Sequence, residues 1–143
     1  MSVSKKYVNN GRIQILVGKS YQEIGVFVTE DPTLAIHEDL ERPYLFTVTQ
    51  ISSGLAVYSC GEWERAMQFV WKARCVCWSR KYLDETDLKE LAEVIYMMDT
   101  SAEQRRARGG VKDIRRVVKE SISRIKSVYR DNKELIDGIQ NKV

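Results

Sequence analysis

The sequence has few of the side chains that bind transition metals or act as nucleophiles. It contains one histidine, His37, and three cysteines, Cys60, Cys75 and Cys77. On a helix, residues two apart such as Cys75 and Cys77 point about 200° away from each other, whereas zinc ligands converge on one point. The apolar neighbours of Cys75 and Cys77 favour packed, reduced thiols, and we interpret His37 as a surface residue. The sequence therefore predicts no metal and no cofactor.

Complete catalytic motifs are also lacking. The stretch Gly-Lys-Ser at 18–20 resembles part of a phosphate-binding loop, but that motif places another glycine five positions before its Gly-Lys. Here the preceding glycine is Gly11, and a predicted strand occupies the residues between. Paired carboxylates such as Glu38 and Asp39 are typical of a solvated loop. We therefore expect that the protein is not an enzyme.

Long apolar runs are absent, and none approaches the roughly 20 residues that cross a bilayer. The start, Met-Ser-Val-Ser-Lys-Lys, has no apolar region typical of a secretory signal. An odd number of cysteines does not favour a disulfide framework. These features predict a cytoplasmic protein without a membrane partner.

The first sixty residues have the alternation and turn residues of an antiparallel sheet with three to four strands. We expect strands at 12–17, 24–29, 44–51 and 55–59, with the acidic segment between the second and third forming a loop or one helical turn. Ser-Ser-Gly at 52–54 predicts a hairpin turn, in which Gly54 takes a positive φ.

The rest of the chain has helical spacing, so we expect an α+β fold. Ser59 and Glu62 fit a capping box that would begin a mostly buried helix at 62–80, lying on the sheet. A second helix is predicted at 84–98, and a long basic C-terminal helix from Val111 to about Ile139. We treat residues 1–143 as one domain, with a sheet part at 1–60 and a helical part at 61–143 that breaks near 109–110.

The C-terminal helix has apolar residues at alternating steps of three and four, close to a heptad seam. At about 42 Å it is long for this chain, so part of the seam should protrude or meet a partner. Asn132 lies at a seam position, where a buried asparagine can fix the register of two helices. A homodimer through this seam is therefore one expectation.

Basic residues concentrate between 105 and 130, a segment that contains ten basic residues and two acidic residues. The basic side chains of the helix fall roughly between 40° and 140° on a helical wheel, its acidic side chains cluster near 200°, and the apolar seam centres near 300°. We expect them to bind a protein partner or nucleic acid, although a solvated helix face has the same pattern. The candidate contact residues are Arg105, Arg106, Arg108, Lys112, Arg115, Arg116, Lys119, Lys126 and Arg130.

The segment 46–57, Phe-Thr-Val-Thr-Gln-Ile-Ser-Ser-Gly-Leu-Ala-Val, is followed by Glu-Arg-Ala at 64–66 in a predicted helix. This strand–Ser-Gly–strand–helix pattern resembles that of small uncharacterised accessory proteins from bacteriophages and other mobile elements. The resemblance covers about 30 residues and carries over no functional residue. It implies an accessory protein of phage type that acts in the host cytoplasm. Such accessory proteins include regulators and inhibitors of host nucleic-acid enzymes and defence systems.

Together these features predict a non-enzymatic interaction protein of phage type. It would bind and modulate or inhibit a host protein, or a nucleic-acid-processing or defence complex, through the basic C-terminal helix. The alternative is a protein that binds DNA or RNA directly with the same basic residues.

Overall fold

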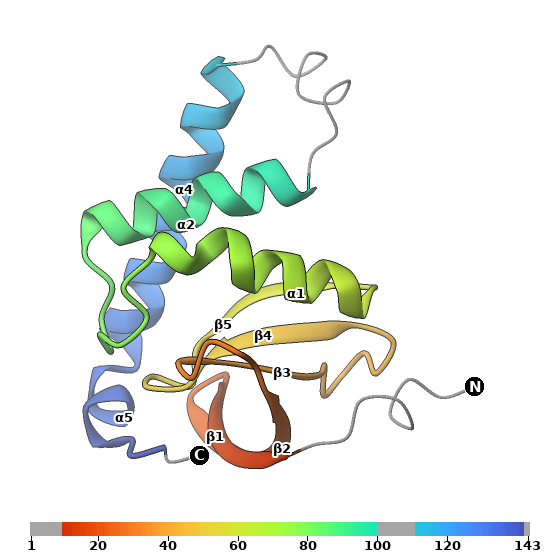
Figure 1. Ribbon diagram of the computed structural model, residues 1–143. Helices are drawn as coiled ribbons and strands as arrows, with labels where there is room; N and C mark the ends of the chain where they lie inside the picture. Colours follow the sequence, from red (N-terminus) through yellow and green to blue (C-terminus); the bar gives the residue numbers. More distant parts are fainter. Residues whose placement is uncertain (1–9, 100–110, 142–143) are drawn as a thin grey trace.

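The computed structural model describes residues 10–99 and 111–141, and within them it has an α+β fold (Figure 1). Five antiparallel strands form a meander in the order β1-β2-β3-β4-β5. Their bounds are β1 Gly11–Val17, β2 Ser20–Val28, β3 Leu34–Glu38, β4 Phe46–Gln50 and β5 Ala56–Cys60. The expected α+β class with an antiparallel sheet is confirmed, but the sheet has five strands in this part of the chain rather than the expected three to four.

The strand that we missed is β3. It pairs with β4 over its whole length, from Leu34 opposite Gln50 to Glu38 opposite Phe46. Acidic residues flank it on both sides, which is why the sequence favours a loop or one helical turn here. Its middle is nevertheless apolar, because Leu34 and Ile36 pack into the main core while Ala35 packs into a smaller cluster on the other face.

The sheet curls so that β1 returns to the β4–β5 hairpin (Figure 1). The amide of Leu16 donates to the carbonyl of Gly54 over 2.9 Å. Gly54 has the positive φ expected from the sequence, at 72°. A Cβ at this position would lie 2.7 Å from the carbonyl oxygen of Gln14, so the close approach of the two backbones requires glycine.

The C-terminal segment holds this junction together. The side-chain amide of Asn141 donates to the carbonyls of Gln14 and Ile51, over 2.9 and 2.7 Å, and its Oδ1 accepts from the amide of Gln14 over 2.7 Å. One side chain therefore bridges the edge strand β1 and the β4–β5 hairpin, beside the backbone hydrogen bond from Leu16 to Gly54.

Helix α1, Trp63–Lys72, lies across β3–β5 and continues into a single 3₁₀ turn, η2, at Ala73–Cys75 (Figure 1). The predicted capping box is wrong: Ser59 belongs to β5, and Glu62 precedes the helix in an extended conformation without a side-chain cap hydrogen bond. The predicted extent to residue 80 is also wrong, because α1 ends at Lys72 and the 3₁₀ turn ends at Cys75. The helix is also less buried than expected, since Trp71 near its end is 65% exposed.

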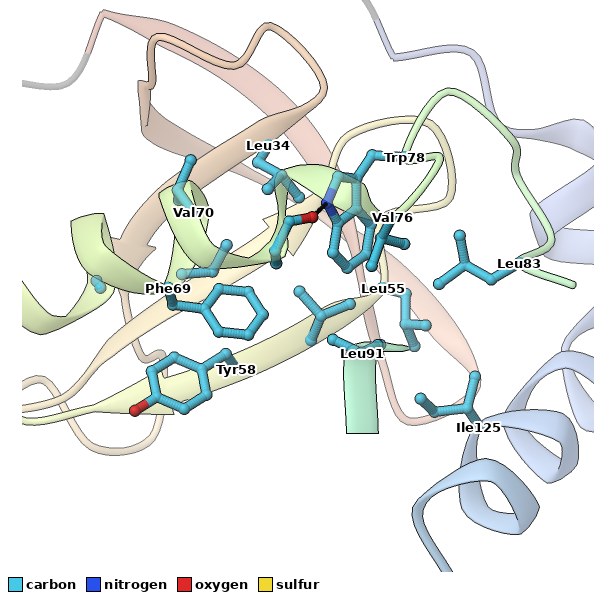
Figure 2. Close-up of a cluster of buried hydrophobic side chains, with 14 of the residues drawn as sticks. Leu34, Leu55, Tyr58, Phe69, Val70, Val76, Trp78, Leu83, Leu91 and Ile125 are labelled. Carbon is cyan, nitrogen blue, oxygen red and sulfur yellow. Dashed lines mark hydrogen bonds between the residues drawn. The ribbon is translucent and has the colours of Figure 1, made fainter. Parts of the chain in front are cut away.

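The main core lies between the sheet and the helices, and Figure 2 shows its side chains converging from both. The rings of Tyr58 on β5 and Phe69 on α1 stack with centroids 4.5 Å apart. Trp78 follows the 3₁₀ turn, and its indole N–H donates to the carbonyl of Ala73 over 2.9 Å, so that the buried ring has its polar group satisfied.

A buried glutamine joins the two halves of the chain. The side-chain amide of Gln50 on β4 donates to the carbonyls of Trp78 and Arg80, over 2.8 and 2.5 Å, and its Oε1 accepts from the Ser53 hydroxyl over 2.6 Å. The connection between α1 and the next helix is thereby fixed to the β4–β5 hairpin. Buried amides are stable only when they are paired in this way.

The remaining helices are α2 Glu85–Asp99, α4 Val111–Asp131 and α5 Lys133–Gly138. Helix α2 is close to its predicted bounds, whereas the C-terminal helix is divided at Asn132, whose φ of −122° and ψ of 22° interrupt the helix. Helix α4 packs against α2 and runs on to α5 (Figure 1). None of the helices in the described ranges is long and apolar enough to cross a membrane.

Candidate functional site

Helices α2 and α4 enclose a groove with a volume of about 420 Å³. We call it the α2–α4 groove. It is lined by Glu85, Lys89 and Glu93 from α2, and by Arg115, Val118, Lys119, Ile122, Ser123 and Lys126 from α4.

Helical spacing explains why these side chains share the groove. Glu85, Lys89 and Glu93 are four residues apart, so they form one ridge along α2. The neighbouring residues Leu88 and Ala92 are buried in the core, so the ridge lies on the adjacent face of α2, at the edge of the core. The lining residues of α4 recur likewise at steps of three and four, next to the buried Ile125.

The apolar floor of the groove consists of Val118 and Ile122, which are one helical turn apart on α4. Both are partly buried, and Ile122 packs against the main core. Apolar surface therefore remains accessible between two rows of charged side chains.

The charges around this floor are not balanced. The Nζ of Lys126 bonds to Oε1 of Glu85, and this pairing holds the pKa of Glu85 below its ordinary value. Lys89, Arg115 and Lys119 form no ion pair with another described residue, and all three are exposed. We call these three residues the basic rim. Glu93 is the one other acid among the described lining residues, so the open charge of this part of the groove is positive.

The structure separates the contact residues expected from the sequence into three groups. Arg115, Lys119 and Lys126 line the groove. Arg116 and Arg130 are exposed on α4 but do not line it. Lys112 lies in α4, near the start of the helix, while Arg105, Arg106 and Arg108 lie outside the described residues.

Sequence reasoning missed the contribution of α2. Lys89 belongs to the basic rim, yet only the packing of α2 on α4 brings it near Arg115 and Lys119. The spacing of Glu85, Lys89 and Glu93 marks them as one ridge, but it does not say which helix faces that ridge.

Two other surface features surround the core. A hollow of about 410 Å³ lies beside the edge strand β5, with Ile95, Arg124 and Val128 on its helical side. The exposed face of α1 presents Trp63, Met67 and Trp71. These places are more apolar than charged, and neither combines an apolar floor with several unpaired cations.

His37 is not a surface residue, contrary to our expectation, since it is only 6% exposed. Its Nδ1 lies 2.9 Å from the carbonyl of Glu38, which can only accept, so Nδ1 carries the proton. Its Nε2 then accepts from the hydroxyl of Thr49 over 2.8 Å. Burial lowers the pKa of His37 below 6.5. The neutral ring is therefore fully bonded, which is typical of a structural histidine.

The cysteines differ from expectation in part. Cys60 is buried, but Cys75, the last residue of the 3₁₀ turn, is exposed, and Cys77, which follows that turn, is half-buried. Partial desolvation of the sulfur, together with the neighbouring carboxylate of Glu90, raises the pKa of the Cys75 thiol. A raised pKa disfavours the thiolate that nucleophilic chemistry requires. Within the described residues, no three His, Cys, Asp or Glu side chains group in a way that could hold a metal ion.

Comparisons with known proteins found no match to a family model, to a curated protein or to a solved structure. The geometry of the chain itself therefore carries the functional argument.

Proposed function

We propose that the protein is a non-enzymatic interaction protein that binds a protein partner through the α2–α4 groove. The observation that carries this proposal is the position of Val118 and Ile122, an accessible apolar floor beside the three unpaired cations of the basic rim. Apolar area gives affinity in protein interfaces, and charge around it selects the partner.

The composition of the groove favours protein over nucleic acid. Its accessible floor is apolar, and apolar side chains give affinity in protein interfaces but gain nothing from the phosphates of a nucleic-acid backbone. Direct DNA or RNA binding remains the alternative, and the exposed side chains of Arg116 and Arg130 support it.

The resemblance to phage accessory proteins suggests what kind of partner to seek. A host component of a nucleic-acid-processing or defence complex, modulated or inhibited in the cytoplasm, fits both that resemblance and the basic rim. A homodimer through the heptad seam stays a prediction. Because Ile125 and Ile139 are buried within the chain, a second copy would contact the seam at Val118 and Ser121, which are partly exposed.

Matched charge reversals test the proposal. The groove variant is Arg115→Glu with Lys119→Glu, and the control is Arg124→Glu with Arg130→Glu, which makes the same change of charge on the same helix outside the groove. The wild-type protein and each variant are immobilised and used to pull down proteins from a host-cell lysate, with and without nuclease treatment. We expect a protein partner that resists nuclease, is lost with the groove variant and is kept by the control.

The proposal is wrong if the folded groove variant retains every partner that the wild-type protein retains. Loss of the partner on nuclease treatment would instead support nucleic acid. In that case the affinity for DNA or RNA should fall steeply with salt, by about 0.9 in log affinity per log unit of salt for each phosphate neutralised.

A further inference from the structure

We infer that the α2–α4 groove takes an acidic amphipathic helix of a partner protein. This inference rests on the proposed function, since it names the chemistry of the partner that the same groove would bind. It adds two claims: that the bound segment is helical, and that acidic residues flank its apolar face.

The walls of the groove favour a helical ligand over an extended one. All of the described residues that line it come from α2 and α4, and none of the described strands contributes to it. An extended peptide gains affinity mainly by adding a strand to a sheet edge, which this groove does not offer. A helix instead lays its apolar face into a groove between other helices, with side-chain anchors one turn apart.

The length of the floor sets the number of anchors. Val118 and Ile122 are four residues apart on α4, which corresponds to about 6 Å along the helix axis. Side chains at i and i+3 or i+4 of a partner helix have about the same separation. We therefore expect two apolar anchors on the bound helix, one for each turn that touches the floor.

The charges argue that the flanks of the bound helix are acidic. The basic rim has Lys89 on α2, whereas Arg115 and Lys119 lie on α4, so cations stand on both walls. A neutral helix covering them would take three positive charges out of water with Glu93 as the one unpaired acid of the described lining to offset them, which is costly. Aspartate or glutamate on both sides of the apolar anchors would pair them instead.

One end of the groove is already neutral. There Lys126 is bonded to Glu85, so this cation needs no partner. The acidic residues of the bound helix should therefore face Lys89, Arg115 and Lys119 rather than Lys126. Replacing Lys126 should accordingly weaken binding less than replacing Lys119.

The probe for this inference is a displayed library of helical peptides about 16 residues long, or roughly four turns, selected against the full chain. We expect the enriched peptides to have two apolar residues three or four positions apart with acidic residues on both flanks. Their affinity should fall about tenfold or more for Arg115→Glu with Lys119→Glu, and also for Ile122→Glu. It should change little for the control Arg124→Glu with Arg130→Glu.

Three outcomes overturn the inference: no enrichment, enrichment of basic or uncharged peptides, or acidic peptides that bind the groove variant as well as the wild type. If host partners nevertheless depend on Arg115 and Lys119, the proposed function stands and only the helical acidic ligand is wrong. If neither peptides nor host proteins depend on these residues, both ideas fail. Binding of a DNA or RNA duplex with steep salt dependence, and of no peptide, would replace both with the nucleic-acid alternative.

Discussion

Replacing Gly54 by alanine should destabilise the fold considerably more than replacing Gly18 by alanine. Both glycines have a left-handed backbone, with φ of 72° at Gly54 and 65° at Gly18. A side chain in this conformation costs about 1–2 kcal/mol at either position. The two sites differ in their surroundings, because a Cβ at Gly18 meets nothing within 4 Å. Gly18→Ala therefore measures the conformational cost alone.

At Gly54 the added methyl group would meet the backbone of β1 and the C-terminal segment. It would lie 2.7 Å from the Gln14 carbonyl oxygen, 3.2 Å from the Cα of Ile15 and 3.1 Å from Cδ1 of Ile139. Overpacking of this kind costs about 1–3 kcal/mol further, because backbone cannot move aside as a flexible side chain can. We expect a total loss of about 2–5 kcal/mol for Gly54→Ala, against about 1–2 kcal/mol for Gly18→Ala.

Urea unfolding followed by tryptophan fluorescence measures both losses by linear extrapolation. The wild-type protein and the two variants should unfold with similar slopes, and Gly54→Ala should have the lowest midpoint. Equal losses for the two variants would refute the reasoning. They would mean that β1 does not approach the β4–β5 hairpin as closely as the structure shows.

Three further stability measurements test the core. Burial lowers the pKa of His37 below 6.5, so the unfolded chain binds a proton on this ring more readily than the folded chain. The free energy of unfolding should therefore be constant above pH 6.5 and decrease below it, by at most about 1.4 kcal/mol per pH unit, and the contribution of His37 to this decrease should be absent from His37→Gln. Phe69→Ala should cost about 3–5 kcal/mol in urea unfolding because Phe69 is fully buried, whereas Trp71→Ala should change the stability by less than about 0.5 kcal/mol; similar losses would contradict the placement of α1. The Oδ1 of Asn132 is buried without a hydrogen-bond partner among the described residues, and its Nδ2 donates to the Val128 carbonyl, which already accepts from the Asn132 backbone amide. Asn132→Leu should therefore leave the melting temperature unchanged or raise it, and a large fall in melting temperature would show that Oδ1 has a hydrogen-bond partner in the folded protein.

Local signals in the sequence were enough for several elements. Helix α2 has apolar residues at helical spacing and an acidic first turn, and its predicted bounds differ little from those observed. The hairpin turn at Gly54 was predictable because few residues other than glycine adopt a positive φ. These features depend on residues that are near each other in the chain.

The errors came from contacts between distant residues. Strand β3 is stabilised by pairing with β4, which outweighs the acidic residues around it. The capping box failed because Ser59 is needed in β5, where its hydroxyl bonds to that of Thr47 over 3.0 Å. His37 is buried because its ring finds Thr49 across the strand pair, and the groove exists only because α2 packs on α4.

The central claim is that the α2–α4 groove binds a protein partner through its basic rim, and site-specific photo-crosslinking tests it most directly. A benzophenone amino acid is placed at Ser123, which lines the groove, or at Gln22, which is exposed on β2 as a control. In cells that produce the protein, Ser123 should form a nuclease-resistant protein adduct that Gln22 does not form and that Arg115→Glu with Lys119→Glu removes. An adduct at Ser123 that persists in this charge-reversed background, or that disappears with nuclease, would contradict the claim.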